Sequence, residues 1–286
     1  RLHDLPPFIT ISCDNLSDNG DKLRAAVTRF AEARGDRDLA RWIAAESAFP
    51  CSMVDSITPA TDEALRSQAA DALGVEDAWP VERERFVQWV IDERLGADAE
   101  LFRSAGVTVA RSVSPFERAK LRLLNGAHST LAYVGLGLGC ETVSEAMADP
   151  RLAGFVERMM RDDVAATLAA SELDVGDYIA QVLARFRNPA IVHKLSQIAW
   201  DGSQKLRFRL LETAAEALLA DRPVDRLAAG VAAWMRFVVR QTRAGAPIVD
   251  PLSDMLAAVG RGCADTSADV DRFLALPDVF PPALAA

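Results

Sequence analysis

The chain has 286 residues, of which 50% are hydrophobic, so it can bury a sizeable core, and disorder of the whole chain is excluded. Its formal net charge of -9 gives no general electrostatic reason to bind nucleic acid or an anionic membrane surface. We therefore expect a small-molecule ligand, a monomer or dimer, and no nucleic-acid or membrane partner.

The sparse cysteines and histidines argue against a disulfide framework and against a metal centre. No C-x-x-C pair occurs among Cys13, Cys51, Cys140 and Cys263, which favours a reducing cytoplasm. No H-E-x-x-H or comparable spacing surrounds His3, His128 or His193, so no metal is expected. The longest apolar runs fall short of the roughly 20 residues that a membrane span requires.

The first third of the chain mixes strand and helix patterns. Residues 8–13 are short and partly β-branched, which predicts a strand that runs into a turn-rich loop at residues 14–20. Apolar residues at helical spacing predict two helices over residues 21–49 with a break near Gly35, and another over residues 61–72. Residues 79–109 predict loops with a few short strands.

From Pro115 onward the pattern is helical, beginning with the N-cap sequence Ser114-Pro115-x-Glu117. Later helices are predicted over residues 152–169, 175–186, 204–219, 224–243 and 252–259. The expected fold class is mostly α: a multi-helical C-terminal substrate domain with a short β/α remnant of a preceding domain.

Lys120, Asn125 and His128 lie on the first of these helices. At about 100° per residue, Asn125 and His128 lie about 140° and 80° around from Lys120, on one broad side. The leucines between them would bury this side, and a lysine that acts as a base needs its pKa lowered by roughly three units, or about 4 kcal/mol. The structural alternative is a solvated Lys120, an Asn125 at a helix irregularity and a core His128, and spacing alone favours it.

The amino-acid sequence of the whole segment carries more information than the spacing of these three residues. It reads Phe116-Glu117-x-x-Lys120-Leu121-Arg122-Leu123-Leu124-Asn125-Gly126-x-His128-Ser129, then Leu131-Ala132-Tyr133-x-Gly135. This segment resembles the signature of the mannitol dehydrogenase family of polyol-specific long-chain dehydrogenases. The resemblance implies that Lys120 is the general base and that Asn125 and His128 hold the reacting oxygen.

Three further segments resemble the same family in the same order. Ser12-Cys13-Asp14-Asn15 implies that Asn15 is a second amide at the reacting oxygen, and Ser52-Met53-Val54-Asp55 implies that Asp55 binds substrate hydroxyls. Asp201-Gly202-Ser203-Gln204-Lys205 implies that Lys205 reaches the substrate. Taken singly, these segments could equally be a turn, a cap and a helix stop.

One position departs from the members that are specialised for mannitol. They carry an arginine where this chain has Gln197, and the neighbouring sequence resembles the fructuronate reductases more closely. The resemblance therefore favours fructuronate and mannonate as substrates, with mannitol and fructose next. A substrate carboxylate would need a cation, which Lys205, Lys194 or Arg209 could supply.

The resemblance implies a metal-independent oxidoreductase that acts on CH–OH groups with NAD, and NADP stays open. Gly135-x-Gly137-x-Gly139 is not a dinucleotide fingerprint, because that spacing requires glycine where Cys140 stands; close helix packing is expected instead. Residues 1–50 are expected to be the trailing end of a Rossmann cofactor domain and residues 51–286 the helical substrate-binding and catalytic domain.

Most of a cofactor domain is thus expected to be missing, which makes the chain a fragment that is inactive alone. The alternative function is a non-catalytic helical module that binds a sugar acid or a partner protein.

Overall fold

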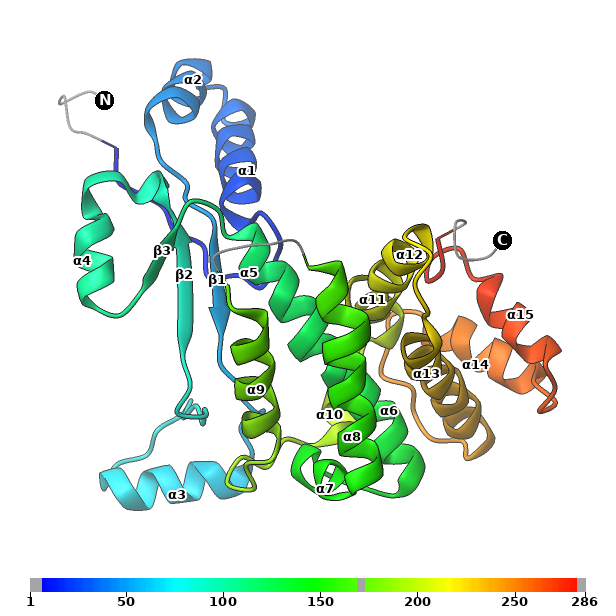
Figure 1. Ribbon diagram of the computed structural model, residues 1–286. Coiled ribbons are helices and arrows are strands. Elements are labelled where there is room, and N and C mark those ends of the chain that lie inside the picture. Colours follow the sequence, from blue (N-terminus) through cyan, green and yellow to red (C-terminus); the bar gives the residue numbers. More distant parts are fainter. Residues whose placement is uncertain (1–6, 169–172, 282–286) are drawn as a thin grey trace. The chain divides into compact units, whose positions relative to one another are not determined.

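The computed structural model describes residues 7–168 and 173–281, which belong to two compact units (Figure 1). The first unit ends at Arg118 and the second begins at Ala119. The predicted boundary at residue 50 divides a cofactor domain from a substrate domain, and it stays a prediction. Each unit has its own secondary structure and its own buried side chains.

The first unit contains a three-stranded sheet in the order β1-β2-β3 (Figure 1). β1 (Ser52–Asp55) pairs antiparallel with β2 (Gln88–Asp92), and Ser52 lies opposite Ile91. β2 pairs parallel with β3 (Thr108–Ala110), so the carboxyl ends of these two strands lie at the same edge. Val90 and Ile91 of the central strand are completely buried, which makes β2 the core of this sheet.

Short helices accompany the sheet: α1 (Asn19–Ala33), α2 (Arg37–Glu46), α3 (Glu63–Leu73), the 3-10 turns η1 (Glu93–Asp98), α4 (Ala99–Ser104) and α5 (Ser114–Ala119). The carboxylates of Asp36 and Asp62 accept hydrogen bonds from Leu39 N and Leu65 N, which fixes where α2 and α3 begin. Gly35, at a φ of +80°, separates α1 from α2. The helix, break and helix predicted over residues 21–49, and the helix over residues 61–72, are confirmed.

The strand predicted at residues 8–13 is wrong, because this extended segment joins no ladder in the described part of the chain. Thr10 N donates to Ala48 O, but the carbonyl of Ser12 accepts from the side chains of Asn19 and Ser52. Side-chain donors thus use a carbonyl that a neighbouring strand would need.

The expected fold class also understated the β structure. Strands reach residue 110, so the β/α part of the chain is not a short remnant near its start. The sequence pattern underestimated these strands because β2 and β3 are short, and only two residues of β2 are completely buried. Such short apolar runs do not reveal which strand they will pair with.

The regular elements described in the second unit are helices, apart from one isolated bridge between Thr142 and Lys194. Its α-helices are α6 (Gly126–Leu138), α7 (Val143–Ala148), α8 (Pro150–Arg158), α9 (Val175–Phe186), α10 (Leu195–Ile198), α11 (Gly202–Leu206), α12 (Glu212–Leu219), α13 (Asp225–Arg243), α14 (Ser253–Gly262) and α15 (Ala268–Leu274), and η4 (Ala165–Thr167) is a 3-10 turn. α6 lies against α7, α8, α10 and α13, and it is buried on all sides from Gly126 to Tyr133. Within the described residues, no helix has both the length and the apolar character needed to cross a bilayer.

Three stretches of this unit are π-helical: η2 (Lys120–Asn125), η3 (Met159–Val164) and η5 (Arg207–Leu211). Each ends with an N–H that donates to the carbonyl five residues earlier, for example from Gly126 N to Leu121 O. η2 contacts both η3 and η5. The sequence predicts unbroken helices over residues 152–169 and 204–219 and missed these wider turns; Ala169 itself lies outside the described residues.

The three glycines near the end of α6 have three different surroundings. A Cβ added at Gly135 would lie 2.6 Å from Leu195 Cδ1, so close packing is confirmed there. At Gly137 the nearest atom to such a Cβ is Nη1 of Arg240, at 3.4 Å. Gly139, at a φ of +86°, is the C-cap of α6. The packing prediction therefore holds only at Gly135.

Candidate active site

Lys120, Asn125 and His128 are all buried on the continuous helical run from η2 into α6, with exposed fractions of 8%, 8% and 5%. Counting 100° per residue separated Lys120 and Asn125 by about 140°. Their stretch is instead a π turn, in which residues five apart are hydrogen-bonded neighbours along the helix. The turn therefore brings these two side chains closer to one face than the sequence arithmetic did.

A buried arginine fixes η2 in place. Arg122 is only 4% exposed, and its two terminal nitrogens donate to the carboxylate of Glu216 at 2.6 and 2.5 Å. It also donates to Thr167 Oγ1 at 3.0 Å. A guanidinium that is held in this bidentate way restricts rotation of the helix about its axis, so it orients Lys120 and Asn125 as well.

His128 is enclosed by aromatic rings. Its ring lies 4.4 Å from that of Phe186, centroid to centroid, and 5.0 Å from that of His193 in an edge-on arrangement. Its Nε2 atom is buried and has no hydrogen-bond partner among the described residues. Because a buried polar atom without a partner is costly, this nitrogen suits a ligand hydroxyl.

Burial keeps both imidazoles neutral near pH 7. It lowers the pKa of His128 well below the usual value, with smaller contributions from His193, Arg209 and Arg185. Burial likewise lowers the pKa of His193 to about 4. A neutral imidazole offers one donor and one acceptor nitrogen, so His128 can orient a hydroxyl group without adding charge.

Two cations on neighbouring turns are coupled to each other, and one of them, Arg209, also acts on His128. Arg209 of η5 donates from Nη1 to Ser129 Oγ at 3.1 Å, and burial lowers its pKa to about 10. Lys205 of α11 lies 3.6 Å from a carboxylate oxygen of Asp201, and burial followed by the charge of Arg209 lowers its pKa. The predicted residue Lys205 and the cation Arg209 thus belong to one electrostatic group.

Gln197 is half-buried on α10, a four-residue helix that packs against α6. Lys194, the third cation considered for a substrate carboxylate, is exposed. Only Lys205 and Arg209 of the three are therefore placed in partly buried surroundings.

Asn15 and Asp55 belong to the first unit, whereas the other predicted residues belong to the second. Asn15 is exposed in the loop before α1, and Asp55 is the buried last residue of β1. The roles of both residues stay predictions.

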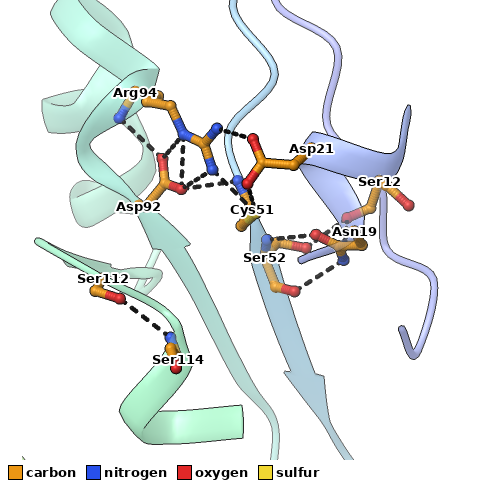
Figure 2. Close-up of polar contacts among 9 residues, drawn as sticks. All are labelled: Ser12, Asn19, Asp21, Cys51, Ser52, Asp92, Arg94, Ser112 and Ser114. Carbon is orange, nitrogen blue, oxygen red and sulfur yellow. Dashed lines mark hydrogen bonds and ion pairs between the residues drawn. The ribbon is translucent and has the colours of Figure 1, made fainter. Parts of the chain in front are cut away.

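The asparagine that organises this loop is Asn19 (Figure 2). Its side-chain nitrogen donates to the carbonyls of Ser12, Asp14 and Ser52, and its oxygen accepts from Ser52 N at 2.9 Å. The amide therefore ties the segment before α1 to the start of β1. Its hydrogen bonds are all to protein backbone, which indicates a structural role for Asn19 and leaves Asn15 as the predicted site residue.

A polar cluster lies beside the start of β1 in the same unit (Figure 2). Asp18, Asp21 and Cys51 could hold a metal ion, since one ligand atom of each lies within 4.8 Å of the others. However, Arg94 donates to Asp21 Oδ1 at 2.6 Å and to Cys51 Sγ at 2.9 Å. These residues line a cleft of about 540 Å³ in the first unit. A metal ion would have to displace the guanidinium of Arg94, so the cluster is better described as an ion-pair network.

His193 and Tyr133 were not predicted as site residues from the sequence. His193 is 65 positions from His128 in the chain, and only the fold brings the rings together. Tyr133 packs within the same region: its hydroxyl donates to Ala199 O, and burial raises its pKa. Its place in the quoted segment, five residues after His128, was the one available signal.

Comparisons with known proteins agree with the family resemblance of the segment around Lys120. The model of the mannitol dehydrogenase C-terminal domain matches residues 112–286, and that of the mannitol dehydrogenase Rossmann domain matches residues 1–101. The second match overturns the expected short β/α remnant, because it covers about twice the stretch of 50 residues assigned to that domain from the sequence.

Individual relatives are similar along nearly the whole chain. YeiQ, an uncharacterized oxidoreductase of Escherichia coli, is 41% identical over 98% of this chain and 57% of its own length. Mannitol 2-dehydrogenase of Aspergillus fumigatus is 36% identical over 96% of this chain and 55% of its own length.

A solved structure is similar over almost the same extent. The ternary complex of Pseudomonas fluorescens mannitol 2-dehydrogenase with NAD and D-mannitol matches with a TM-score of 0.81 and 34% identity. That match covers 99% of this chain and 57% of the other. The chain thus spans a little more than half the length of these relatives.

Proposed function

The chain belongs to the mannitol dehydrogenase family, and on that premise we propose that it provides the substrate-binding and proton-transfer residues of an oxidoreductase. The reaction interconverts a secondary alcohol of a polyol or sugar acid with the ketone. The observation that carries this proposal is the burial of Lys120, Asn125 and His128 on one helical run, with His128 Nε2 unpaired among the described residues.

Lys120 is proposed as the general base. In the oxidation direction its neutral amine accepts the proton of the reacting hydroxyl, and in the reduction direction its ammonium group returns a proton to the ketone oxygen. The apolar packing of its turn supports this role, since Leu123 and Leu124 are buried beside it. Surroundings of this kind disfavour the charged form of a lysine.

Asn125 and His128 are proposed to hold the reacting oxygen and its neighbour. The amide N–H of Asn125 donates to the oxygen as negative charge develops on it, and His128 Nε2 binds a substrate hydroxyl. Asn15 is proposed as a second amide donor, and Asp55, Lys205 and Gln197 as residues that bind substrate hydroxyl groups or a substrate carboxylate. Each assignment is tested separately by substitution.

NAD is the proposed cofactor, with NADP as the alternative, and the nicotinamide supplies the hydride acceptor in this class of reaction. Two helix starts of the first unit, those of η1 and α1, do not fit its diphosphate. η1 follows β2 with Asp92 as its cap, and a Cβ at Gly20 of α1 would lie 2.4 Å from Phe49 O. Neither helix start is a glycine-rich cradle. We therefore assign residues to proton transfer and propose none for binding the cofactor.

The proposed substrate pair is fructuronate and mannonate, followed by fructose and mannitol. Gln197 in place of an arginine supports this preference, as do the partly buried cations Lys205 and Arg209. The proposed compartment is the cytoplasm, which suits the free thiols of all four cysteines.

The test uses a chimera in which this chain replaces the matching region of Pseudomonas fluorescens mannitol 2-dehydrogenase. NADH formation is measured with D-mannonate and with D-mannitol. We expect Lys120→Met to lower turnover by about 100-fold to 10,000-fold, because it removes the general base. The control Lys22→Met removes an exposed lysine and should leave turnover unchanged.

Turnover of Lys120→Met within threefold of the unsubstituted chimera would refute the assignment of Lys120. Circular dichroism and the melting temperature establish that both variants are folded. If the unsubstituted chimera folds and binds mannonate without any turnover, the non-catalytic sugar-acid-binding module becomes the better description.

A further inference from the structure

Several arginines of this protein that contact distant segments form ion pairs with carboxylates. The buried Arg122 lies 2.5 Å from Glu216, the half-buried Arg226 lies 2.7 Å from Asp163, and the exposed Arg94 lies 2.6 Å from Asp92. At Arg122 and Arg226, a charge that is wholly or partly withdrawn from water is balanced by an opposite charge. This is the usual requirement for a buried guanidinium.

Arg209 is the exception among the described residues of the second unit's site. Its guanidinium donates a hydrogen bond to the neutral hydroxyl of Ser129, and no carboxylate of a described residue forms an ion pair with it. Its side chain is half-buried, and this burial is the largest cause that lowers its pKa. The charge of Asp201 raises the pKa of Arg209, but this carboxylate is paired with Lys205 at 3.6 Å.

The position of Arg209 is fixed by close packing of backbone against backbone. A Cβ at Gly126 would lie 2.7 Å from Arg209 O, so η5 is pressed directly against the first turn of α6. Ser129, which receives the guanidinium hydrogen bond, is 1% exposed and follows His128 in the chain. The unpaired cation is therefore held beside the turn that presents His128.

We propose that Arg209 binds the carboxylate of a six-carbon sugar acid and so selects hexonate and hexuronate substrates over neutral polyols. The proposal rests on the proposed function, and it assigns the substrate class to a residue outside the proton-transfer trio. A single guanidinium matches one carboxylate in charge and in geometry, because its parallel N–H groups meet both oxygens. A phosphate dianion would call for more positive charge than this one unpaired side chain offers.

The first test changes the ligand and leaves the protein intact. Isothermal titration of the whole chain, with and without NAD, compares D-mannonate, D-mannonamide, D-mannitol and D-mannitol 1-phosphate. Mannonamide keeps the shape of mannonate without its charge. We expect mannonate to bind at least about tenfold more tightly than the amide or the polyol, as a charge-assisted bidentate contact predicts.

The second test changes the protein. Arg209→Gln should weaken mannonate binding by about 10-fold to 100-fold and change mannitol binding by less than threefold. Arg209→Lys keeps the charge without the planar fork, so it should retain part of the preference, which also guards against a folding defect in Arg209→Gln. The matched control is Arg207→Gln, an exposed arginine two residues away whose nearest carboxylate is 3.7 Å distant.

Equal affinity for mannonate and mannonamide would overturn the proposal, as would tighter binding of mannitol 1-phosphate. Either result leaves the proposed oxidoreductase function standing, since mannitol can still bind and react. Failure of all four ligands to bind would overturn both. Lys120→Met distinguishes the proton-transfer role of Lys120 from the carboxylate-binding role of Arg209. It should abolish turnover in the chimera and keep the preference for mannonate over mannonamide.

Discussion

Asn19 of the first unit differs from Arg209 and His128 of the second unit in how far its hydrogen-bonding capacity is used. In the first unit, the amide of Asn19 uses its nitrogen and its oxygen on backbone partners at 2.8 to 3.1 Å. In the second unit, Arg209 has a hydroxyl partner where a carboxylate would be expected, and His128 Nε2 has no partner in the described chain. A saturated buried group holds a fold together, whereas an unsaturated one has capacity left for a ligand.

The largest expected effect comes from removing the saturated amide. Asn19→Ala removes four hydrogen bonds to the backbone of Ser12, Asp14 and Ser52, so we expect the free energy of unfolding to fall by roughly 3 to 5 kcal/mol. Urea unfolding measures the loss, and hydrogen exchange should place it in residues 10–55. Asn15→Ala, in the same loop but exposed, should cost less than about 1 kcal/mol. Equal losses in the two variants would refute the distinction between Asn19 and Asn15.

A smaller effect should follow from pH, and it should be confined to the second unit. The pKa of His193 is about 4 in the folded chain and about 6.5 when unfolded, so the unfolded state binds the extra proton between these values. Stability is then complete above pH 6.5 and lost as the pH falls, by about 2 kcal/mol between pH 6.5 and pH 5. His128, with its lowered pKa, should add to this loss in the same direction.

Hydrogen exchange at pH 7 and pH 5 checks this expectation. Protection should fall in the described residues of 119–281 and hold in residues 7–118, which contain no histidine. His193→Gln should make the second unit less sensitive to pH. If it leaves the pH dependence unchanged, the neutral buried state of His193 is wrong.

The smallest effect compares two glycines of α6. Gly126→Ala introduces a Cβ 2.7 Å from Arg209 O, a backbone atom, so we expect a loss of about 1 to 3 kcal/mol. Gly137 is exposed, and its nearest neighbour is a flexible arginine end, so Gly137→Ala should be neutral or stabilising by up to about 1 kcal/mol. Urea unfolding of the two variants decides, and the reverse order would contradict the close packing of η5 on α6.

Local features were predictable because a short stretch of chain decides them. Asp36 and Asp62 mark their helix starts within three residues, through side-chain bonds that need no distant partner. Burial of the helix that carries Lys120 followed from its neighbouring leucines. The chemistry proposed for this helix came from the amino-acid sequence of one segment. The π turn that sets the angle between Lys120 and Asn125 was not visible in the spacing.

The strands show the opposite case. Residues 8–13 had a strand-like composition but pair with no ladder in the described chain, because side chains of Asn19 and Ser52 take the Ser12 carbonyl. β2 and β3 had weaker patterns and do pair, in parallel register. The partner determines whether an extended segment becomes a strand, and the partner lies elsewhere in the sequence.

The sequence by itself thus determined the helical second unit and the family, and it predicted Lys120, Asn125 and His128 as site residues, since these depend on order along one chain segment. Only the tertiary structure decided which buried polar groups are satisfied and which are not. Arg209 meets Ser129 across 80 positions, and Asn19 meets Ser52 across 33. Hydrogen-bond saturation depends on such distant partners, and burial makes it costly to leave incomplete.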